Sequence, residues 1–262
     1  MVSVGVLASG RGSNFQAIVE HQRLGVFQGV DVSVLIYNYP EAPVKHIAEK
    51  HGIANYLVGH KNVDRVEFER QIMSILDSSE VELVCLAGWD RIVGSEFFRK
   101  YLWKVMNIHP ALLPSFGWKG LNARYVHEAA LEYGVKITGC TVFFVDVSVE
   151  KGPMILQHPV RVLESELELF KNRREDAIQS LSDRVLIHEH RIYSKAIQLY
   201  ADRRLRVYEA VTSGKEAQAN RVVSIDLHDD WEKKWNERQR IFIESQKTAW
   251  GAKAVEAAEE LI

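Results

Sequence analysis

Apolar residues recur along most of the chain in short continuous runs, separated by segments whose apolar positions have helical spacing. Runs that are apolar on both faces are typical of strands buried in a parallel sheet. The expected strands are 2–8, 30–37, 56–58, 81–87 and a run that ends at residue 107. The expected helices between them are 15–21, 42–51, 65–77 and 95–102. The pattern predicts an α/β fold, a Rossmann-like parallel twisted sheet with helices on both faces.

The second half of the chain continues this alternation and then changes character. We expect a helix at 123–133, strands at 137–145 and 154–162, and long helical patterns over 166–201. We place a first domain at 1–205 and a C-terminal extension, expected to be helical, at 206–262. In the extension Trp231, Trp235 and Phe242 fall near one helical face. This stripe either packs against the parent domain or forms a homodimer contact, because alone it would be an exposed apolar patch.

The run that ends near residue 107 stops at an Asn-x-His-Pro sequence. Asn107 and His109 are two residues apart, so they share a face at the end of a strand, and Pro110 prevents further pairing. An amide donor beside an imidazole can hold an oxyanion and pass a proton to a leaving nitrogen. This is acyl-transfer chemistry without a built-in nucleophile. The alternative is a structural turn, which is the commoner use of an isolated Asn-x-His-Pro.

A glycine-containing loop, Ser-Gly-Arg-Gly-Ser-Asn at 9–14, lies between the first strand and the first helix. Gly12 permits a tight turn, and Ser13 or Asn14 at the helix start leaves backbone amides that can bind an anion. Because the loop lacks the Gly-x-Gly-x-x-Gly and P-loop patterns, we expect a single phosphomonoester instead of NAD or ATP. A plain tight turn is the alternative. This loop, residues 88–93 and the 107–109 turn all follow strands, so they are expected to converge on one cleft.

Composition and charge narrow the class of protein. With 262 residues, 47% hydrophobic and 26% charged, the chain has the composition of a soluble globular protein. A net charge of -2 argues against a nucleic-acid binder. No apolar stretch reaches the ~20 residues that span a bilayer, and Met1 leads into a strand pattern instead of a signal peptide, so we expect a cytoplasmic protein without a membrane partner. Cys85 and Cys140 fall in predicted buried strands, so we expect neither a disulfide nor a metal.

Five separated motifs carry a resemblance to a known family. They occupy residues 9–18, 86–92, 107–116, 139–145 and 189–193. In this order and spacing they resemble the phosphoribosylglycinamide formyltransferases of the formyltransferase family. The resemblance covers 1–205 and implies the formyltransferase fold. It also implies transfer of a formyl group from the co-substrate 10-formyltetrahydrofolate to the amine of glycinamide ribonucleotide, a step of purine biosynthesis, without a metal or a covalent enzyme intermediate.

The same resemblance implies roles for individual residues. The residues matched to the substrate are Gly12, Ser13 and Asn14, at its phosphate, and Glu189. The residues matched to the folate are Arg65, Asp90, Arg91, Ile92, Val93 and Asn107. Asn107 would also stabilise the oxyanion, His109 would donate the proton, and Glu150 matches the family's catalytic aspartate.

Three features of the chain depart from the family pattern. Glu150 keeps the aspartate's charge but its extra methylene moves the carboxylate by more than ~1 Å, a displacement that can cost ~100-fold in rate. Asp146 is a candidate substitute. Phe143 stands where the family usually has histidine, which removes a polar neighbour from the site, and the segment 117–127 looks longer than expected before the matched His127.

Three rival functions remain at this stage. Formyltetrahydrofolate deformylase hydrolyses the same folate, but it would normally carry an N-terminal regulatory domain and would not need the phosphate loop. Methionyl-tRNA formyltransferase would need a C-terminal barrel and a basic RNA-binding face, and neither is evident. A catalytically impaired homologue that binds folate or nucleotide without turning it over would also fit the changes at Phe143 and Glu150.

Overall fold

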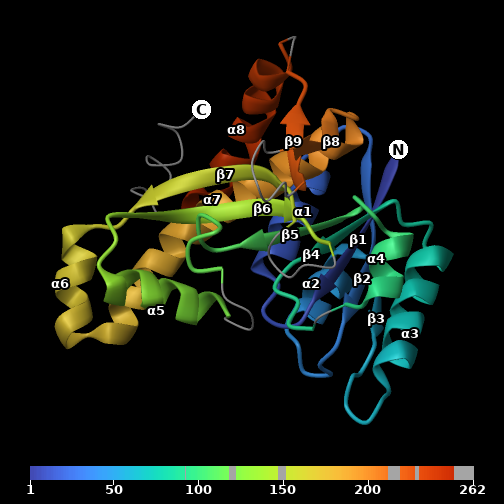
Figure 1. The fold of residues 1–262 in the computed structure, drawn as a ribbon, viewed down its shortest axis with the longest axis horizontal. Helices are drawn as coiled ribbons and strands as arrows, with labels where there is room; N and C mark the ends of the chain where they lie inside the picture. Colours follow the sequence, from blue (N-terminus) through green and yellow to red (C-terminus); the bar gives the residue numbers. More distant parts are fainter. Residues whose placement is uncertain (92, 118–121, 147–151, 212–218, 228–229, 251–262) are drawn as a thin grey trace.

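A seven-stranded sheet with strand order β3-β2-β1-β4-β5-β6-β7 forms the centre of the molecule (Figure 1). The computed structural model describes residues 1–91, 93–117, 122–146, 152–211, 219–227 and 230–250. The strands are β1 (Val2–Ala8), β2 (Val30–Tyr37), β3 (Ala54–Leu57), β4 (Leu83–Leu86), β5 (Val105–His109), β6 (Ile137–Phe144) and β7 (Met154–Arg161). Strands β3 to β5 pair in parallel, whereas β6 and β7 pair antiparallel. The predicted parallel sheet is therefore confirmed, with two antiparallel strands added at one edge.

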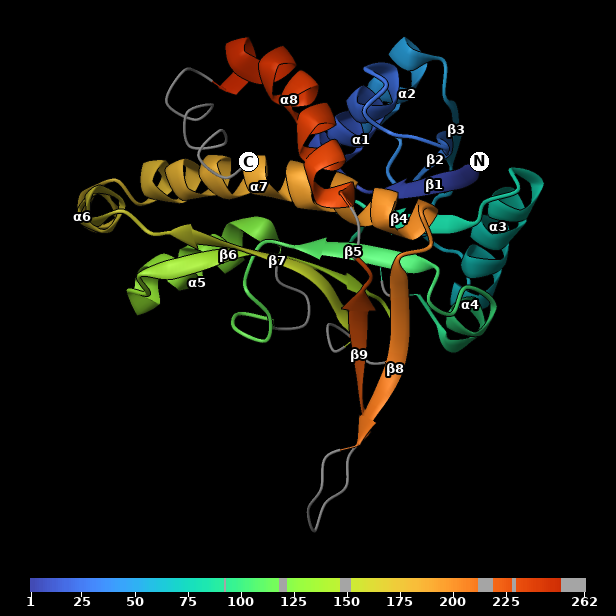
Figure 2. The same ribbon diagram turned by 90° about the horizontal axis from the view of Figure 1, so that it is seen from above.

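Helices cover both faces of this sheet, as predicted (Figure 2). They are α1 (Ser13–Arg23), α2 (Val44–His51), α3 (Arg65–Ser78), α4 (Ser95–Lys100), α5 (Ala123–Tyr133), α6 (Glu164–Asn172), α7 (Arg174–Ala201) and α8 (Trp231–Trp250). Helices α1, α2, α7 and α8 lie on one side, and α3 and α4 lie on the other. Within the ranges that the structure describes, no helix combines the length and the apolar character needed to cross a bilayer.

The alternation of side chains along the strands sorts the core into two layers. On β1, Val4 and Val6 join the cluster that also contains Phe15 of α1, whereas Leu7 joins the cluster that contains Phe97 of α4. All five side chains are fully buried. Both faces of the sheet are covered, so reactive polar side chains are expected at the strand ends. Strands β1, β4 and β5 are neighbours there.

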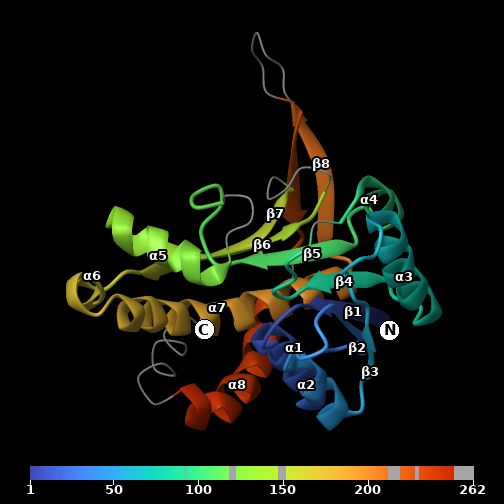
Figure 3. The ribbon, with the colours of Figure 1, turned by 90° about the horizontal axis from the view of Figure 1, so that it is seen from below.

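The C-terminal extension differs from the helical segment that we expected. It begins with a hairpin of β8 (Leu205–Val211) and β9 (Ala219–Ile225), so the prediction of helix is wrong there. Val207 pairs with Val223 and Tyr208 with Val222. Such β-branched and aromatic pairs stabilise strands. The hairpin stands out from the side of the sheet opposite α8 (Figure 3). The expected helix follows as α8.

The aromatic stripe of α8 packs inside the chain. Trp235 is 2% exposed and Phe242 is fully buried. The ring of His21, on α1, lies 3.8 Å from that of Phe242 between centroids, and its Nε2 lies 2.7 Å from Nε2 of Gln239. The stripe therefore packs against the parent domain, and it leaves no exposed patch that calls for a dimer.

Buried neutral histidine makes this packing sensitive to acid. Burial lowers the pKa of His21 to about 4, although hydrogen bonds with Ala17 and Gln239 oppose the shift. The unfolded chain takes up this proton near pH ~6.5, so stability is lost as the pH falls from about 6.5 towards 4. We expect His21 to contribute up to about 1.4 kcal/mol per pH unit in this window. The free energy of unfolding is measured with urea at pH 7 and pH 5. It should fall less between these pH values in His21→Gln than in the wild type.

A matched control removes a histidine from the surface. His46 on α2 is exposed, and His46→Gln should keep the wild-type dependence of unfolding free energy on pH. Equal dependence in His21→Gln and the wild type would contradict the role of His21.

Candidate active site

The polar pair that the sequence singles out lies at the end of β5. Asn107 is half-buried and His109 is 4% exposed. On the neighbouring β6, Phe143 is opposite Asn107 and Thr141 is opposite His109. The turn after His109 is fixed by Thr141, whose hydroxyl donates to the Ala111 carbonyl at 2.7 Å and accepts from the Leu113 amide at 3.0 Å. The pair is therefore held on a strand and by a rigid turn.

His109 is a neutral, oriented imidazole in this structure. Its Nε2 lies 3.1 Å from the carbonyl oxygen of Phe116, so Nε2–H donates and the tautomer is set. Burial lowers the pKa of His109, although this hydrogen bond opposes the shift. His127 of α5 is buried nearby, and its pKa is lowered to about 4 by burial and by repulsion from His109. A nearby carboxylate is therefore needed to hold a charged His109 at neutral pH.

The Asn107 amide is available as a donor. No other residue in the described part of the chain forms a hydrogen bond with this side chain. Phe143 beside it is 1% exposed, so the site is apolar at this point. A hydrogen bond from an amide in such surroundings is stronger than one in water, which suits stabilisation of an oxyanion.

The glycine loop at the end of β1 has the tight turn that was predicted. Gly12 has a φ of +81°, and a Cβ placed on it would lie 2.4 Å from Cγ2 of Val44. Helix α1 begins directly afterwards, at Ser13, with no side-chain cap. The first amides of the helix are therefore left for an anion.

A contact from α7 reaches this loop. Nδ2 of Asn14 donates to Oε2 of Glu189 at 2.8 Å. Burial raises the pKa of Glu189, although this hydrogen bond opposes the shift. The structure thus brings together two residues that are far apart in sequence and that were both matched to the substrate.

Asp90 connects the glycine loop to the segment after β4. Its carboxylate accepts hydrogen bonds from Ser9 Oγ at 2.9 Å, Asn38 Nδ2 at 2.8 Å and Tyr39 Oη at 2.6 Å. Nε of Arg91 also donates to it, at 3.0 Å. Burial raises the pKa of Asp90, but these hydrogen bonds outweigh burial and hold the pKa well below its usual value. Asn38 and Tyr39 were not predicted as site residues. They could have been found in the sequence, because they are polar positions directly after a buried strand.

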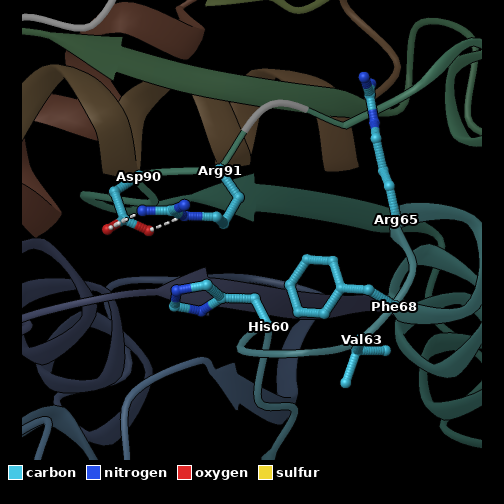
Figure 4. A pocket seen from close by; sticks show the side chains of 6 residues that line it. All are labelled: His60, Val63, Arg65, Phe68, Asp90 and Arg91. Atoms are coloured by element: carbon cyan, nitrogen blue, oxygen red, sulfur yellow. Dashed lines mark hydrogen bonds and ion pairs between the residues drawn. The ribbon is translucent and has the colours of Figure 1, made fainter.

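A pocket of about 360 Å³ opens beside this network (Figure 4). It is lined by His60, Val63, Arg65, Phe68, Asp90 and Arg91. Three residues matched to the folate, Arg65, Asp90 and Arg91, therefore lie together. The Arg65 side chain is 60% exposed and pairs with Glu69.

Two other residues matched to the folate are not placed in this pocket. Val93 is 4% exposed and packs in the core beneath α3 and α4. Ile92 lies outside the described residues. The described residues around the pocket do not include Asn107 or His109, which lie at the end of the neighbouring strand.

Of the two candidate carboxylates, Asp146 and Glu150, the structure describes only Asp146. Asp146 is 6% exposed, and its Oδ2 lies 3.3 Å from Nη1 of Arg221 on β9. Its charge is therefore paired with the C-terminal hairpin. Glu150 lies outside the described residues. In the part of the chain that is described, no cluster of three or more His, Cys, Asp or Glu side chains is arranged to hold a metal ion.

The sequence profile of the formyl transferase family matches residues 2–197. The chain belongs to the formyl transferase family. It is 41% identical over 199 residues to the trifunctional purine biosynthetic protein adenosine-3 of Homo sapiens, which covers 76% of this chain and 18% of that protein. The chain thus spans about a fifth of the length of this curated relative.

Two solved structures match over nearly their whole length. Glycinamide ribonucleotide transformylase 1 from Symbiobacterium toebii is 35% identical, with a TM-score of 0.73, and the match covers 86% of this chain and 94% of that one. Phosphoribosylglycinamide formyltransferase from Anaplasma phagocytophilum is 34% identical, with a TM-score of 0.69, over 87% and 96% of the two chains. A formyltetrahydrofolate deformylase from Pseudomonas syringae is 21% identical, with a TM-score of 0.69, and shares the fold.

In this formyl transferase, three of the matched residues lie at the carboxyl ends of neighbouring strands. Gly12 follows β1, Asp90 follows β4, and His109 ends β5. These strands are neighbours and run parallel. This placement depends on the strand order, which local sequence patterns do not contain. The convergence of the three segments on one cleft stays a prediction.

Proposed function

We propose that this formyl transferase moves the formyl group of 10-formyltetrahydrofolate to the amine of glycinamide ribonucleotide, in purine biosynthesis. The observation that carries the proposal is the placement of Asn107 and His109 at the end of β5, two strands from β1, which leads into the uncapped start of α1 at Ser13. The first arrangement suits acyl transfer, and the second suits a phosphate. The two bacterial relatives named above carry this substrate or activity in their names.

The reaction that these residues support is direct attack by the amine. The amine lone pair forms a bond to the formyl carbon, and the carbonyl electrons move to its oxygen. The Asn107 amide donates a hydrogen bond to that oxyanion. Collapse then breaks the bond from the carbon to the folate nitrogen, which takes a proton from protonated His109. The attacking nitrogen passes its extra proton to the carboxylate of Glu150, which returns a proton to His109. No covalent intermediate with the protein is required.

The carboxylate of this mechanism is Glu150 in our proposal. A buried His109 with a lowered pKa is a poor proton donor unless a negative charge stabilises its protonated form. Asp146 is already paired with Arg221, so its charge is less available. Glu150 matches the family's catalytic aspartate and takes this task.

The remaining assignments concern the two small molecules. Gly12, Ser13 and Asn14 would hold the substrate phosphate, with Glu189 near the substrate. The pocket lined by Arg65 and Phe68 would take part of the folate, because basic and aromatic side chains both line it. Asp90 and Arg91 would line it from the other side, and we keep Ile92 and Val93 as predicted folate contacts.

The cellular setting is also a proposal. We expect these small molecules to be the partners, with no nucleic acid and no membrane, and a cytoplasmic location. A homodimer stays a prediction, and the aromatic stripe of α8 gives no reason for it because Trp235 and Phe242 are buried within the chain.

One assay separates the proposed activity from its rivals. The protein is incubated with 10-formyltetrahydrofolate, with and without glycinamide ribonucleotide, and release of tetrahydrofolate is followed. Release that depends on glycinamide ribonucleotide is expected. Release without it would indicate hydrolysis, and no release in either case would indicate a binding protein.

Substitution of Gly12 tests the phosphate loop. In Gly12→Ala the Cβ would lie 2.4 Å from Val44 Cγ2 at a φ of +81°, so the loop must shift away from its ligand. We expect the KM for glycinamide ribonucleotide to rise by about tenfold or more, since a charged hydrogen bond is weakened, with folate affinity nearly unchanged. Steady-state kinetics and folate titration measure the two effects.

Gly10 provides the matched control, because a Cβ there meets nothing within 4 Å. Gly10→Ala should therefore keep the wild-type KM. An unchanged KM in Gly12→Ala would reduce the loop to a structural turn.

A further inference from the structure

Helix α8 crosses α7 on one side of the sheet (Figure 2). Residues of these two helices and of β7 line a second, smaller pocket there. Its volume is about 90 Å³. Strand β7 contributes His158, helix α7 contributes His188, Arg191 and Lys195, and helix α8 contributes Glu232. Four of these five side chains are basic or imidazole groups, and none of them has a role in the proposed reaction.

Arg191 is the unusual member of this group. Its Nε is buried and has no hydrogen-bond partner within the described part of the chain. Burial lowers the pKa of Arg191. Burying a guanidinium without a carboxylate partner costs free energy. Water can satisfy its hydrogen bonds, but only an anion can neutralise its charge.

His188 adds a second unsatisfied polar atom. It is 8% exposed, and its buried Nδ1 has no partner in the described ranges. Its ring stacks on that of His158 with centroids 4.1 Å apart. Burial and the neighbouring cations lower the pKa of His158 to about 4 and that of His188 to about 3. Both rings are therefore neutral at pH 7 and offer N–H donors without adding charge.

Glu232 does not neutralise Arg191. Its carboxylate accepts a hydrogen bond from Nζ of Lys195 and forms an ion pair with it. The charges of this pair cancel, so the pocket keeps the positive charge of Arg191. A small pocket with one uncompensated guanidinium and an imidazole donor has the chemistry of an anion site.

We propose that this pocket binds a small tetrahedral oxyanion of the size of inorganic phosphate, with Arg191 as its anchor and His188 as a further donor. The volume of about 90 Å³ admits an ion of that size and not a folate. The site is separate from the phosphate loop at the start of α1. It depends on α8, so it is a property of the C-terminal extension as well as of the formyl transferase domain.

Titration with inorganic phosphate tests the proposal directly. The full chain is titrated at constant ionic strength set with potassium chloride, and tryptophan emission, to which Trp235 in the pocket lining contributes, is followed. We expect a saturable change with a dissociation constant of about 1 mM or tighter. Sulfate should give the same change. Arg191→Gln should weaken binding by about tenfold or more, because a hydrogen bond to a charged group contributes that much.

Two further variants separate the pocket from other causes. Arg173→Gln removes an exposed arginine and should bind phosphate as the wild type does. Lys195→Gln frees the charge of Glu232 inside the pocket and should weaken binding, which gives a second test if Arg191→Gln does not fold. The proposal is overturned if chloride alone produces the change, if the wild type shows no saturation, or if Arg191→Gln and Lys195→Gln both bind phosphate normally.

Discussion

Replacing His109 with alanine is expected to lower kcat by about 100-fold or more and to leave folate affinity nearly unchanged. His109 is buried at the end of β5 and is oriented by the Phe116 carbonyl. Its contribution is therefore made mainly in the transition state, where a proton must reach the leaving nitrogen. Single-turnover rates and folate titration measure the two quantities separately.

Asn107→Ala should likewise lower kcat and leave folate affinity nearly unchanged. The amide hydrogen bond that it removes is one that strengthens as the oxyanion forms. His46→Ala, on the exposed surface of α2, is the matched control and should turn over at the wild-type rate. Turnover near the wild-type rate in either Asn107→Ala or His109→Ala would remove that residue from the catalytic machinery.

The second large effect is expected at Glu150. Glu150→Gln should lower kcat/KM by about 100-fold, the usual scale of a proton-transfer group. Loss of the negative charge should also lower the pKa of His109 further. Because His109 acts as a proton donor, activity falls as the pH rises through that pKa. The alkaline limb of the pH profile should therefore move to lower pH in Glu150→Gln.

Two companion variants test the choice of carboxylate. Glu150→Asp should not restore full activity, since the loop must already fit the longer side chain. Asp146→Asn should mainly reduce stability, because it breaks the ion pair with Arg221. A normal rate and pH profile in Glu150→Gln, with the loss found in Asp146→Asn, would assign the relay to Asp146 instead.

Local patterns were sufficient for the strands and helices of the central sheet and for the placement of Asn107 and His109 at a strand end. The apolar runs of β1 and β4 are buried on both faces, and such runs have few other uses. The Asn-x-His-Pro sequence placed Asn107 and His109 on one face, because strand geometry has a period of two. The tight turn at Gly12 was predictable because glycine adopts a positive φ at little cost.

Contacts between distant segments were not predictable from the sequence. The hydrogen bonds of Asp90 with Asn38 and Tyr39 depend on which strands become neighbours. The hairpin that carries Arg221 was missed because the helix formers that follow it dominate the composition of the extension. Its ion pair with Asp146 joins residues 75 positions apart, which no local pattern encodes.

The most direct test of the central claim follows the formyl carbon itself. The protein is mixed with glycinamide ribonucleotide and 10-formyltetrahydrofolate carrying a 13C-labelled formyl group, and the products of one turnover are analysed by mass spectrometry. Direct transfer predicts that the label appears on the amine of glycinamide ribonucleotide, in an amount equal to the tetrahydrofolate released. Label recovered as free formate, with glycinamide ribonucleotide unlabelled, would contradict the account.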